Sequence, residues 1–328
     1  MTRSSLVLAA LLSAALPDAK PVRARLLESD GDLDEAVVED SSGARWVVRA
    51  PRRAAAGAAL EREVALLGAL ARSGAHGLPF AVPSVAGSAA LPEGGRAVVV
   101  PEPAGRPLDL AALLPGPGTA ASLGRALAAV HELPPSVVED AGLPVYESGD
   151  YRDRRLTELD RAAATGEVPP RLLGRWERAL EDVGRWRFSP TVVHGDLVAD
   201  HVLVARGAGA PAVPADGVLP PDGTAPADDL EVSAVIGWGE AKVADPADDL
   251  AWLAAGASEE ALESVLESYA LARTETPDRH VAFRARLAGE LALTRWLLHG
   301  VHLDDAGVVS DAARMLADLD EATREDDA

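Results

Sequence analysis

The first hundred residues alternate between apolar and polar positions in short segments that turn residues separate. Between residues 22 and 48 the segments VRARLLES, AVVED and WVVRA flank DGDLDE and SSGA, a pattern that predicts consecutive antiparallel strands. Residues 54–71 instead place Leu60 and Leu67 on one apolar face with charged residues between them, which predicts a helix. A further strand is predicted at residues 95–100.

The pattern changes after a segment at residues 101–107 that contains proline and glycine. The segments TAASLGRALAAVHEL and RLLGRWERALEDVGRW carry the 3.6-residue apolar period of helices. Short strand-like segments return at residues 191–204 and 232–236, and a tract rich in Pro, Gly and Ala separates them at residues 206–229. This tract predicts a flexible loop inserted in a hairpin, with a lid or partner-binding segment as the alternative. From Asp249 onward the pattern is helical to an acidic end.

These patterns predict an α+β protein with two lobes. The amino-terminal lobe, residues 22–103, is mainly β, and the carboxy-terminal lobe, residues 104–328, is mainly helical, with the site in the cleft between them. Residues 1–21 contain one arginine, a short apolar run and small residues, which is the outline of either a secretory signal segment or a buried first helix. The strand that follows near Val22 without a spacer favours the helix.

Charge and composition narrow the classes of partner. The formal net charge is −21 and the pI is about 4.7, so a nucleic acid or an anionic lipid surface would be repelled. Hydrophobic residues make up 48% of the chain, enough for a large core, yet no uncharged apolar run reaches membrane-spanning length. Of the 31 basic residues only Lys20 and Lys242 are lysines, which predicts that any phosphate clamp uses arginine. The absence of cysteine excludes thiolate chemistry.

Two segments carry candidate chemistry. The segment TVVHGDLVADHVLV places His194, Asp196 and His201 in a short loop between strand-like pieces. The segment VSAVIGWGEAKVADPADDLAWL has an apolar strand, glycines at 237 and 239, and then Asp245 at a helix start. Paired loops that bear carboxylates can hold a base and a metal beside one phosphate.

The order of these segments resembles that of the aminoglycoside phosphotransferases and their kinase-like relatives. HGDL is followed by a strand, then by an I-x-W-x-E-A run and by D-P-x-x-D-L. A histidine at 201, together with Glu240-Ala241 after the tryptophan, is similar to the macrolide phosphotransferase branch. RWVVRAPRR and the following ALEREVALL resemble the strand-three and helix-C region of that branch. The resemblance covers about residues 22–318 except the Pro-rich tract, and it implies a protein-kinase-like two-lobed fold.

The resemblance implies roles for particular residues. Asp196 would accept or orient the proton of the substrate hydroxyl. Arg49 stands where a lysine pairs with nucleotide phosphates, Glu63 would fix it, and loop carbonyls near Pro101 to Pro103 would hold the nucleotide.

The metal and its surroundings follow from the same resemblance. His201 stands where most family members carry a metal-binding asparagine, although nitrogen is a poorer ligand than oxygen for Mg²⁺. His194 is expected to shape the loop through backbone hydrogen bonds, Asp249 is expected to cap or brace it, and the acidic segment at residues 28–35 is a weak glycine-rich loop. The co-substrate would be GTP or ATP with Mg²⁺, GTP being favoured. The acceptor would be a small molecule such as a macrolide, and a cytoplasmic monomer is expected.

One position departs from the family pattern. The residue between Ile236 and Trp238 is Gly237, where the family has a metal-bridging aspartate, so Glu240 becomes the expected substitute ligand. We expect the backbone freedom of Gly237 not to be required, so that Gly237→Asp would restore the carboxylate. Two alternatives stay open: a kinase-fold binding protein without transfer, and a metal hydrolase built on the histidine and aspartate residues of the first segment.

Overall fold

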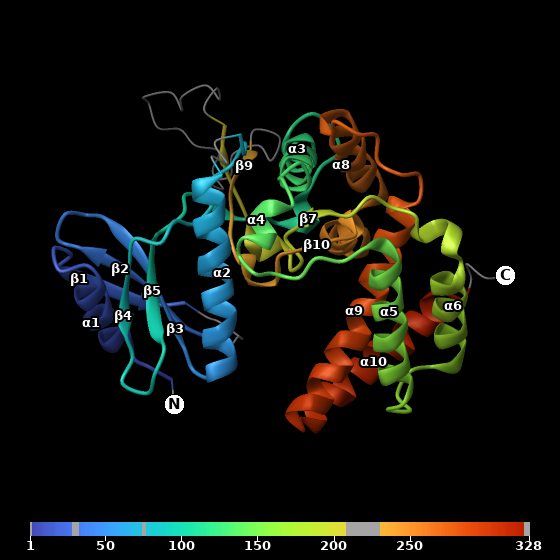
Figure 1. The fold of residues 1–328 in the computed structure, drawn as a ribbon, viewed down its shortest axis with the longest axis horizontal. Helices are drawn as coiled ribbons and strands as arrows, with labels where there is room; N and C mark the ends of the chain where they lie inside the picture. The colour runs from blue at the N-terminus through green and yellow to red at the C-terminus, as the bar shows by residue number, and fades with distance from the viewer. Residues whose placement is uncertain (1, 28–32, 74–76, 208–229, 325–328) are drawn as a thin grey trace, which may run out of the picture.

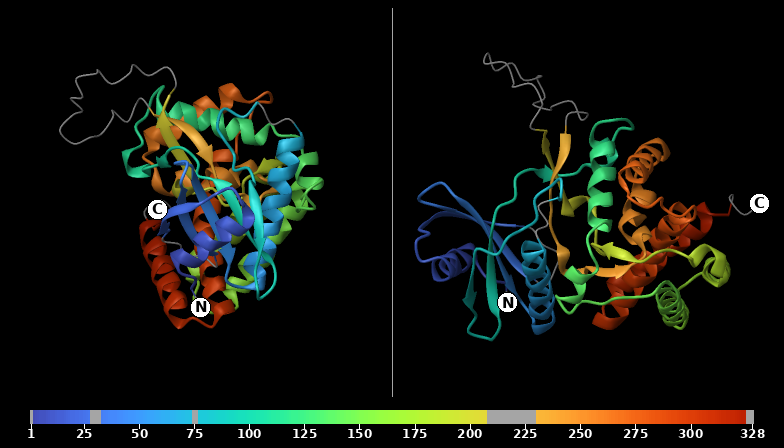
Figure 2. Two further views of the ribbon diagram at one scale, coloured as in Figure 1. Left: turned by 90° about the vertical axis from the view of Figure 1, so that its left-hand side faces the viewer. Right: turned by 45° about the horizontal axis from the view of Figure 1, so that its top comes forward.

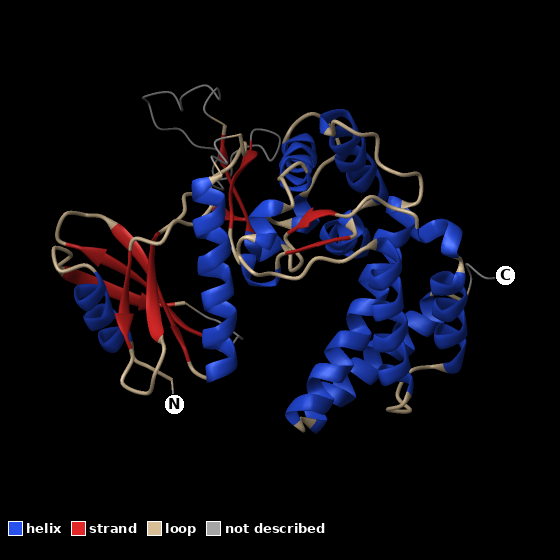
Figure 3. Cartoon of the chain, in the orientation of Figure 1, coloured by secondary structure: helices blue, strands red, loops and turns tan. Residues whose placement is uncertain are grey.

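The computed structural model describes residues 2–27, 33–73, 77–207 and 230–324. A sheet-rich amino-terminal lobe and a helical carboxy-terminal lobe lie side by side (Figure 1), and the colouring by secondary structure makes the division plain (Figure 3). The predicted α+β two-lobed fold is confirmed.

The amino-terminal lobe is built on one five-stranded sheet of order β1-β2-β3-β5-β4, in which every neighbouring pair is antiparallel. Its strands are β1 (Pro21–Leu26), β2 (Leu33–Asp40), β3 (Arg45–Pro51), β4 (Gly87–Ala90) and β5 (Arg96–Pro101). The alternation seen in the sequence therefore corresponds to consecutive antiparallel strands.

One helix covers each face of this sheet. Neighbouring side chains of a strand point to opposite faces, so the same strands supply apolar residues to both helices. Val48 and Val99 lie in a cluster with Leu8 and Leu12 of helix α1 (Ser5–Ala15), both of which are fully buried. Val98 lies on the other face, in a cluster with side chains of helix α2 (Ala54–Arg72). The first helix therefore packs as part of the amino-terminal lobe.

Helix α2 also contacts the second lobe. It touches η5 (Trp238–Glu240) and α4 (Ser136–Glu139), and it lies between the sheet and the helical lobe in the further views (Figure 2). A helix that starts beside β3 thus reaches the segment that carries the candidate metal residues.

Two small sheets position the loops of the carboxy-terminal lobe. β6 (Arg106–Pro107), β8 (Val202–Arg206) and β9 (Leu230–Val235) form one, and β7 (Thr191–Val193) with β10 (Lys242–Ala244) forms the other. β8 and β9 form the predicted hairpin. The tract predicted as an inserted loop at residues 206–229 lies outside the described residues from 208 onward, and Arg206 belongs to β8.

Helices make up the rest of this lobe. They are α3 (Thr119–His131), α5 (Ser148–Ala163), α6 (Pro170–Glu181), α7 (Ala251–Gly256), α8 (Glu259–Ala272), α9 (Val281–Leu303) and α10 (Ala306–Ala322), with short 3-10 turns η1 (Leu110–Ala112), η2 (Val183–Trp186), η3 (Ala199–His201) and η6 (Pro246–Leu250). Within the described part of the chain, none of these helices is both long and apolar enough to cross a membrane.

Candidate active site

The two motif segments meet where β7 and β10 pair. Lys242 lies opposite Val193 in this ladder, so the loop that follows β7 starts beside the end of the loop that precedes β10. Two backbone contacts join them: the Ile236 amide donates to the His201 carbonyl at 3.0 Å, and the His194 ring nitrogen Nε2 lies 2.9 Å from the Ile236 carbonyl oxygen. Residues some forty positions apart therefore form one site.

Asp249 holds the loop that follows β7 from its buried side. Its carboxylate accepts hydrogen bonds from the backbone amides of His194 at 2.7 Å and Gly195 at 2.8 Å. It also lies 3.2 Å from Nε2 of His131, whose Nδ1 is 2.8 Å from the Tyr269 hydroxyl. Burial alone would raise the pKa of Asp249, but the hydrogen bond and charge of His131 lower it. Asp249 is thus a buried carboxylate that braces the loop, as its position in the sequence indicated.

His194 is a structural residue of the loop. Its side chain is fully buried, and its ring lies 4.7 Å from the Trp238 ring. Burial lowers the pKa of His194 from 6.5 to about 4, so the ring is neutral at pH 7. Its Nε2 therefore donates to the Ile236 carbonyl, and its Nδ1 accepts from the Asp196 amide at 3.4 Å. This matches the expectation that His194 shapes the loop through backbone contacts.

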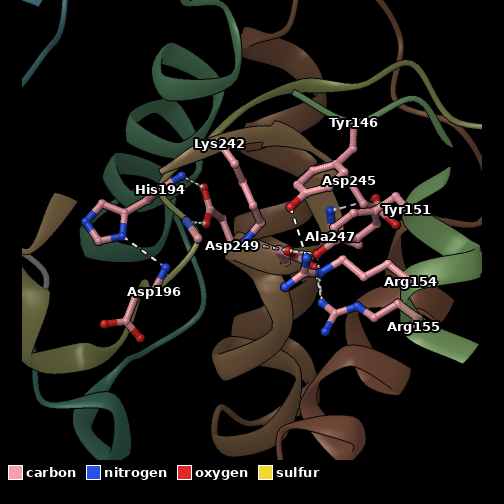
Figure 4. A network of polar contacts seen from close by, with 12 residues as sticks. Tyr146, Tyr151, Arg154, Arg155, His194, Asp196, Lys242, Asp245, Ala247 and Asp249 are labelled. Atoms are coloured by element: carbon pink, nitrogen blue, oxygen red, sulfur yellow. Dashed lines mark hydrogen bonds and ion pairs between the residues drawn. The ribbon is translucent and has the colours of Figure 1, made fainter. Parts of the chain in front are cut away.

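Asp196 differs from these buried groups because its side chain is 56% exposed. Figure 4 shows its carboxylate pointing away from Asp249 and Lys242. Gly195 immediately before it has φ +82°, and this left-handed backbone turns the chain so that the carboxylate leaves the buried side. A carboxylate held on a braced loop and open to solvent can accept a proton from a bound hydroxyl.

His201 is held beside Asp196 and against Gly237. Its Nδ1 lies 2.6 Å from the Asp196 backbone carbonyl and 3.9 Å from the Oδ2 of the same residue. Gly237 has φ +83°, and a Cβ built on it would lie 2.8 to 2.9 Å from three ring atoms of His201. The expectation that the backbone freedom of Gly237 is not required is therefore wrong, since the left-handed backbone strains most side chains and the neighbouring ring occupies the place of a Cβ.

Glu240 does not share a ligand group with His201. Its side chain is 63% exposed, and its Oε1 lies 3.9 Å from a guanidinium nitrogen of Arg62 on α2. Across the described ranges no three His, Cys, Asp or Glu residues are grouped so that they could hold a metal ion. The assignment of His201 and Glu240 as metal ligands stays a prediction.

Arg49 sits on β3 between two carboxylates. Its Nε donates to Glu35 and its Nη1 to Glu63 of α2, each at 2.8 Å. The Glu63 side chain is almost fully buried, and its second oxygen, Oε1, has no hydrogen-bond partner among the described residues. The partner expected from the sequence is in contact with Arg49, while nucleotide binding by Arg49 stays a prediction.

Other predicted nucleotide contacts lie at the junction of the lobes. Pro101 ends β5, opposite Trp46, and Pro103 follows it in the segment that leads to the second lobe. The acidic segment considered as a glycine-rich loop lies partly outside the described residues, at 28–32; its last residues, from Leu33, belong to β2.

Sequence reasoning missed a buried charge network beside the loop. Lys242 Nζ lies 3.3 Å from Asp248 Oδ2 and would be 2.9 Å from a Cβ built on Gly195. Asp248 also accepts from Arg155 at 2.8 Å and from the Tyr151 hydroxyl. Burial alone would raise the pKa of Asp248, but the charges of Arg155 and Lys242 hold it well below its usual range. The rarity of lysine in the chain was the one signal that could have drawn attention to Lys242.

Comparison with known proteins adds a family. The sequence profile described as "Phosphotransferase enzyme family" matches residues 23–213. Among curated proteins, the uncharacterized protein YcbJ of Bacillus subtilis (strain 168) is 23% identical over 242 residues, which cover 69% of this chain and 68% of YcbJ.

Solved structures agree with this family over nearly the whole chain. The apoenzyme of macrolide 2'-phosphotransferase MphH from Brachybacterium faecium is 25% identical, with a TM-score of 0.75 over 94% of this chain and 97% of its own. A macrolide 2'-phosphotransferase type I is also 25% identical, with a TM-score of 0.73 over 96% and 98%. A GDP and kanamycin complex of an APH(2") protein has a TM-score of 0.73 at 19% identity over 97% and 99%, a likeness of fold alone.

Proposed function

We propose that this chain, which belongs to the phosphotransferase enzyme family, transfers the γ-phosphate of a nucleoside triphosphate to a hydroxyl of a small molecule. The observation that carries the proposal is the Asp196 carboxylate, which is exposed while the loop that bears it is braced by the buried Asp249. Phosphoryl transfer needs mainly positioning and charge stabilisation, so a fixed loop with one open carboxylate suits it.

Asp196 would be the proton acceptor in this transfer. The acceptor hydroxyl oxygen attacks the γ-phosphorus, its new bond to phosphorus forms, and the bond from the γ-phosphorus to the β,γ-bridging oxygen breaks. The hydroxyl proton passes to Asp196, and the nucleoside diphosphate leaves with the bridging oxygen. His194 takes no part in this transfer, because both its ring nitrogens are committed to backbone groups.

The nucleotide would lie between the lobes. Arg49, fixed by Glu63 and Glu35, presents a guanidinium that can pair with the phosphates, and carbonyls near Pro101 and Pro103 would meet the base. We propose GTP over ATP because the chain resembles the macrolide kinases; structures of similar fold hold GDP, ADP or ATP, so the fold alone does not favour either nucleotide.

Magnesium would reach this site on the nucleotide phosphates. The residues present do not fit a site in which the protein itself holds the ion. Gly237 offers no side-chain oxygen, His201 offers nitrogen where Mg²⁺ prefers oxygen, and Glu240 is exposed near Arg62. No step is therefore assigned to a protein-held metal.

The acceptor we propose is a macrolide-type antibiotic. Two structures at 25% identity that match nearly the whole chain are macrolide 2'-phosphotransferases, and their likeness supports this class over other small hydroxyl compounds. A cytoplasmic monomer that meets cellular nucleotides would be consistent with this role.

A second candidate is a binding protein with the same fold that does not transfer phosphate. The specific observation in its favour is Gly237, because a site without that carboxylate loses the usual link between metal and phosphates. Binding of nucleotide would survive in such a protein, whereas turnover would not.

The test is transfer of labelled γ-phosphate from GTP, and separately ATP, to an erythromycin-like macrolide. Wild type is compared with Asp196→Asn, which removes the proton acceptor while keeping the shape, and with Glu240→Gln. We expect turnover in wild type and its loss in Asp196→Asn, whose thermal unfolding should be unchanged. Turnover that persists in Asp196→Asn would reassign the base. Nucleotide binding without turnover in wild type would favour the binding protein.

A further inference from the structure

The unusual feature of the site is the close contact between Gly237 and His201. The Cβ that any other residue would carry at 237 falls 2.8 Å from Cε1 and Nε2 of the imidazole and 2.9 Å from Cδ2. Three ring atoms at nearly equal distance mean that the face of the ring, rather than one edge, lies against the glycine. The ring therefore fills the space into which a side chain at 237 would grow.

His201 is held in this place from several sides. Its ring Nδ1 lies 2.6 Å from the Asp196 carbonyl oxygen, its carbonyl accepts from the Ile236 amide at 3.0 Å, and its amide donates to the Val198 carbonyl at 3.0 Å. The side chain is only 26% exposed. The two backbone hydrogen bonds fix the main chain at His201, and the ring cannot move aside without breaking its contact from Nδ1 to the Asp196 carbonyl.

We infer that His201 is a positioning residue that replaces the metal-holding carboxylate: its imidazole occupies the space over Gly237 and fixes the Asp196 carbonyl. Nucleotide then binds without any magnesium ligand from residue 237. The nucleotide part of this inference rests on the proposed function, while the coupling of the two residues does not. Gly237 and His201 therefore form a coupled pair, in which the effect of replacing one residue depends on whether the other is present.

The coupling can be measured by thermal unfolding of four proteins: wild type, Gly237→Ala, His201→Ala and the double variant. Gly237→Ala should lower Tm by at least about 4 °C, because it combines backbone strain with the clash against the ring. In the His201→Ala background only the strain remains, so the loss should fall to about half.

Gly43→Ala is the matched control, since Gly43 has φ +84° and nothing lies within 4 Å of the place that its Cβ would take. The decrease in Tm of Gly43→Ala reports the cost of left-handed backbone alone. It should resemble the decrease that Gly237→Ala causes in the His201→Ala background. Equal losses for Gly237→Ala in both backgrounds would overturn the inference, with or without nucleotide binding.

The magnesium consequence is tested by calorimetry with a non-hydrolysable GTP analogue, in Mg²⁺ and in a chelator. Wild-type Kd should change by less than about threefold between the two conditions. Gly237→Asp should gain nothing, because its carboxylate meets the ring. The double variant Gly237→Asp, His201→Asn has a shorter side chain at 201. In Mg²⁺ it should bind the GTP analogue at least about tenfold more tightly than wild type, since Asp tolerates left-handed backbone and supplies a hard oxygen.

The outcomes separate the two proposals. Tenfold or stronger dependence on Mg²⁺ in wild type would overturn the inference and leave the proposed function standing. An equal gain in nucleotide affinity from Gly237→Asp in the wild-type and His201→Asn backgrounds would also overturn the inference, because the ring would then not exclude the carboxylate. Failure of every variant to bind nucleotide would remove the proposed function, and the unfolding cycle would still decide the coupling.

Discussion

His194 should make stability fall as the solution is acidified below neutral pH. The ring is fully buried, and burial lowers its pKa to about 4 in the folded protein, compared with 6.5 for an exposed histidine. Between these two values the unfolded chain binds a proton that the folded protein does not. Stability from this group is therefore complete above pH 6.5 and is lost as the pH falls toward 4.

The size of the effect follows from the two pKa values. A shift of one pKa unit corresponds to about 1.4 kcal/mol, so the whole difference between 6.5 and 4 amounts to about 3 kcal/mol. Integration from pH 7.5 to pH 5.0 covers only part of the titration and gives a loss of about 2 kcal/mol. The Asp249 carboxylate contributes little in this window, because its pKa is lowered from an ordinary value of 3.8.

Urea unfolding of wild type and His194→Asn at pH 7.5 and pH 5.0 measures this contribution. The variant can still accept from the Asp196 amide in the place of Nδ1, but it does not reach the Ile236 carbonyl, and it is less stable at both pH values because it loses that bond and leaves a small cavity. The comparison is therefore between the two losses on acidification. Wild type should lose about 2 kcal/mol more than the variant. Equal losses would refute the argument that burial keeps His194 neutral.

Three further substitutions probe the groups that hold the loop. Asp249→Asn should cost about 3 kcal/mol of unfolding free energy in urea and abolish transfer, since an amide cannot accept from both loop amides. Asp248→Asn should cost about 3 kcal/mol by removing the closer of the two carboxylates that pair with the buried Arg155, the other being Glu158 at 3.3 Å, whereas Lys242→Met should cost about 1 kcal/mol; equal costs would contradict this ranking. Gly195→Ala should lower Tm by several degrees, about 4 °C or more, because its methyl group meets the Glu240 carbonyl at φ +82°; an unchanged Tm would show that the loop yields.

The fold could be predicted because its signals are local and ordered. Alternation along β2 and β3 and the apolar stripe of α2 each arise within one element, and the order of elements then restricts the topology. Asp249 was expected to brace the loop because it follows a proline helix start, where a carboxylate commonly serves backbone amides. Features that one short segment determines were therefore accessible from the sequence.

Contacts between distant segments were not accessible in this way. His131 and Asp249 are 118 positions apart, and His131 and Tyr269 are 138 apart, yet the three side chains form one buried chain next to the loop that carries Asp196. Each residue stands in an ordinary helical pattern that gives no reason to pair it with the others. The packing of α3 against α8 brings His131 to Tyr269, and Asp249 reaches His131 from η6, so the arrangement depends on the whole lobe.

The glycine at position 237 has one interpretation from the sequence and another from the structure. From the sequence a glycine in place of an aspartate indicates the loss of a ligand, and restoring the aspartate follows as the remedy. With φ +83° and the His201 ring against it, the glycine is instead required by its neighbour. His201 changes meaning too, since a histidine that resembles a metal ligand has one ring nitrogen committed to the Asp196 carbonyl and its face against Gly237. Because the ring lies where a side chain at 237 would start, a carboxylate at 237 requires the His201 ring to take another position or to be replaced.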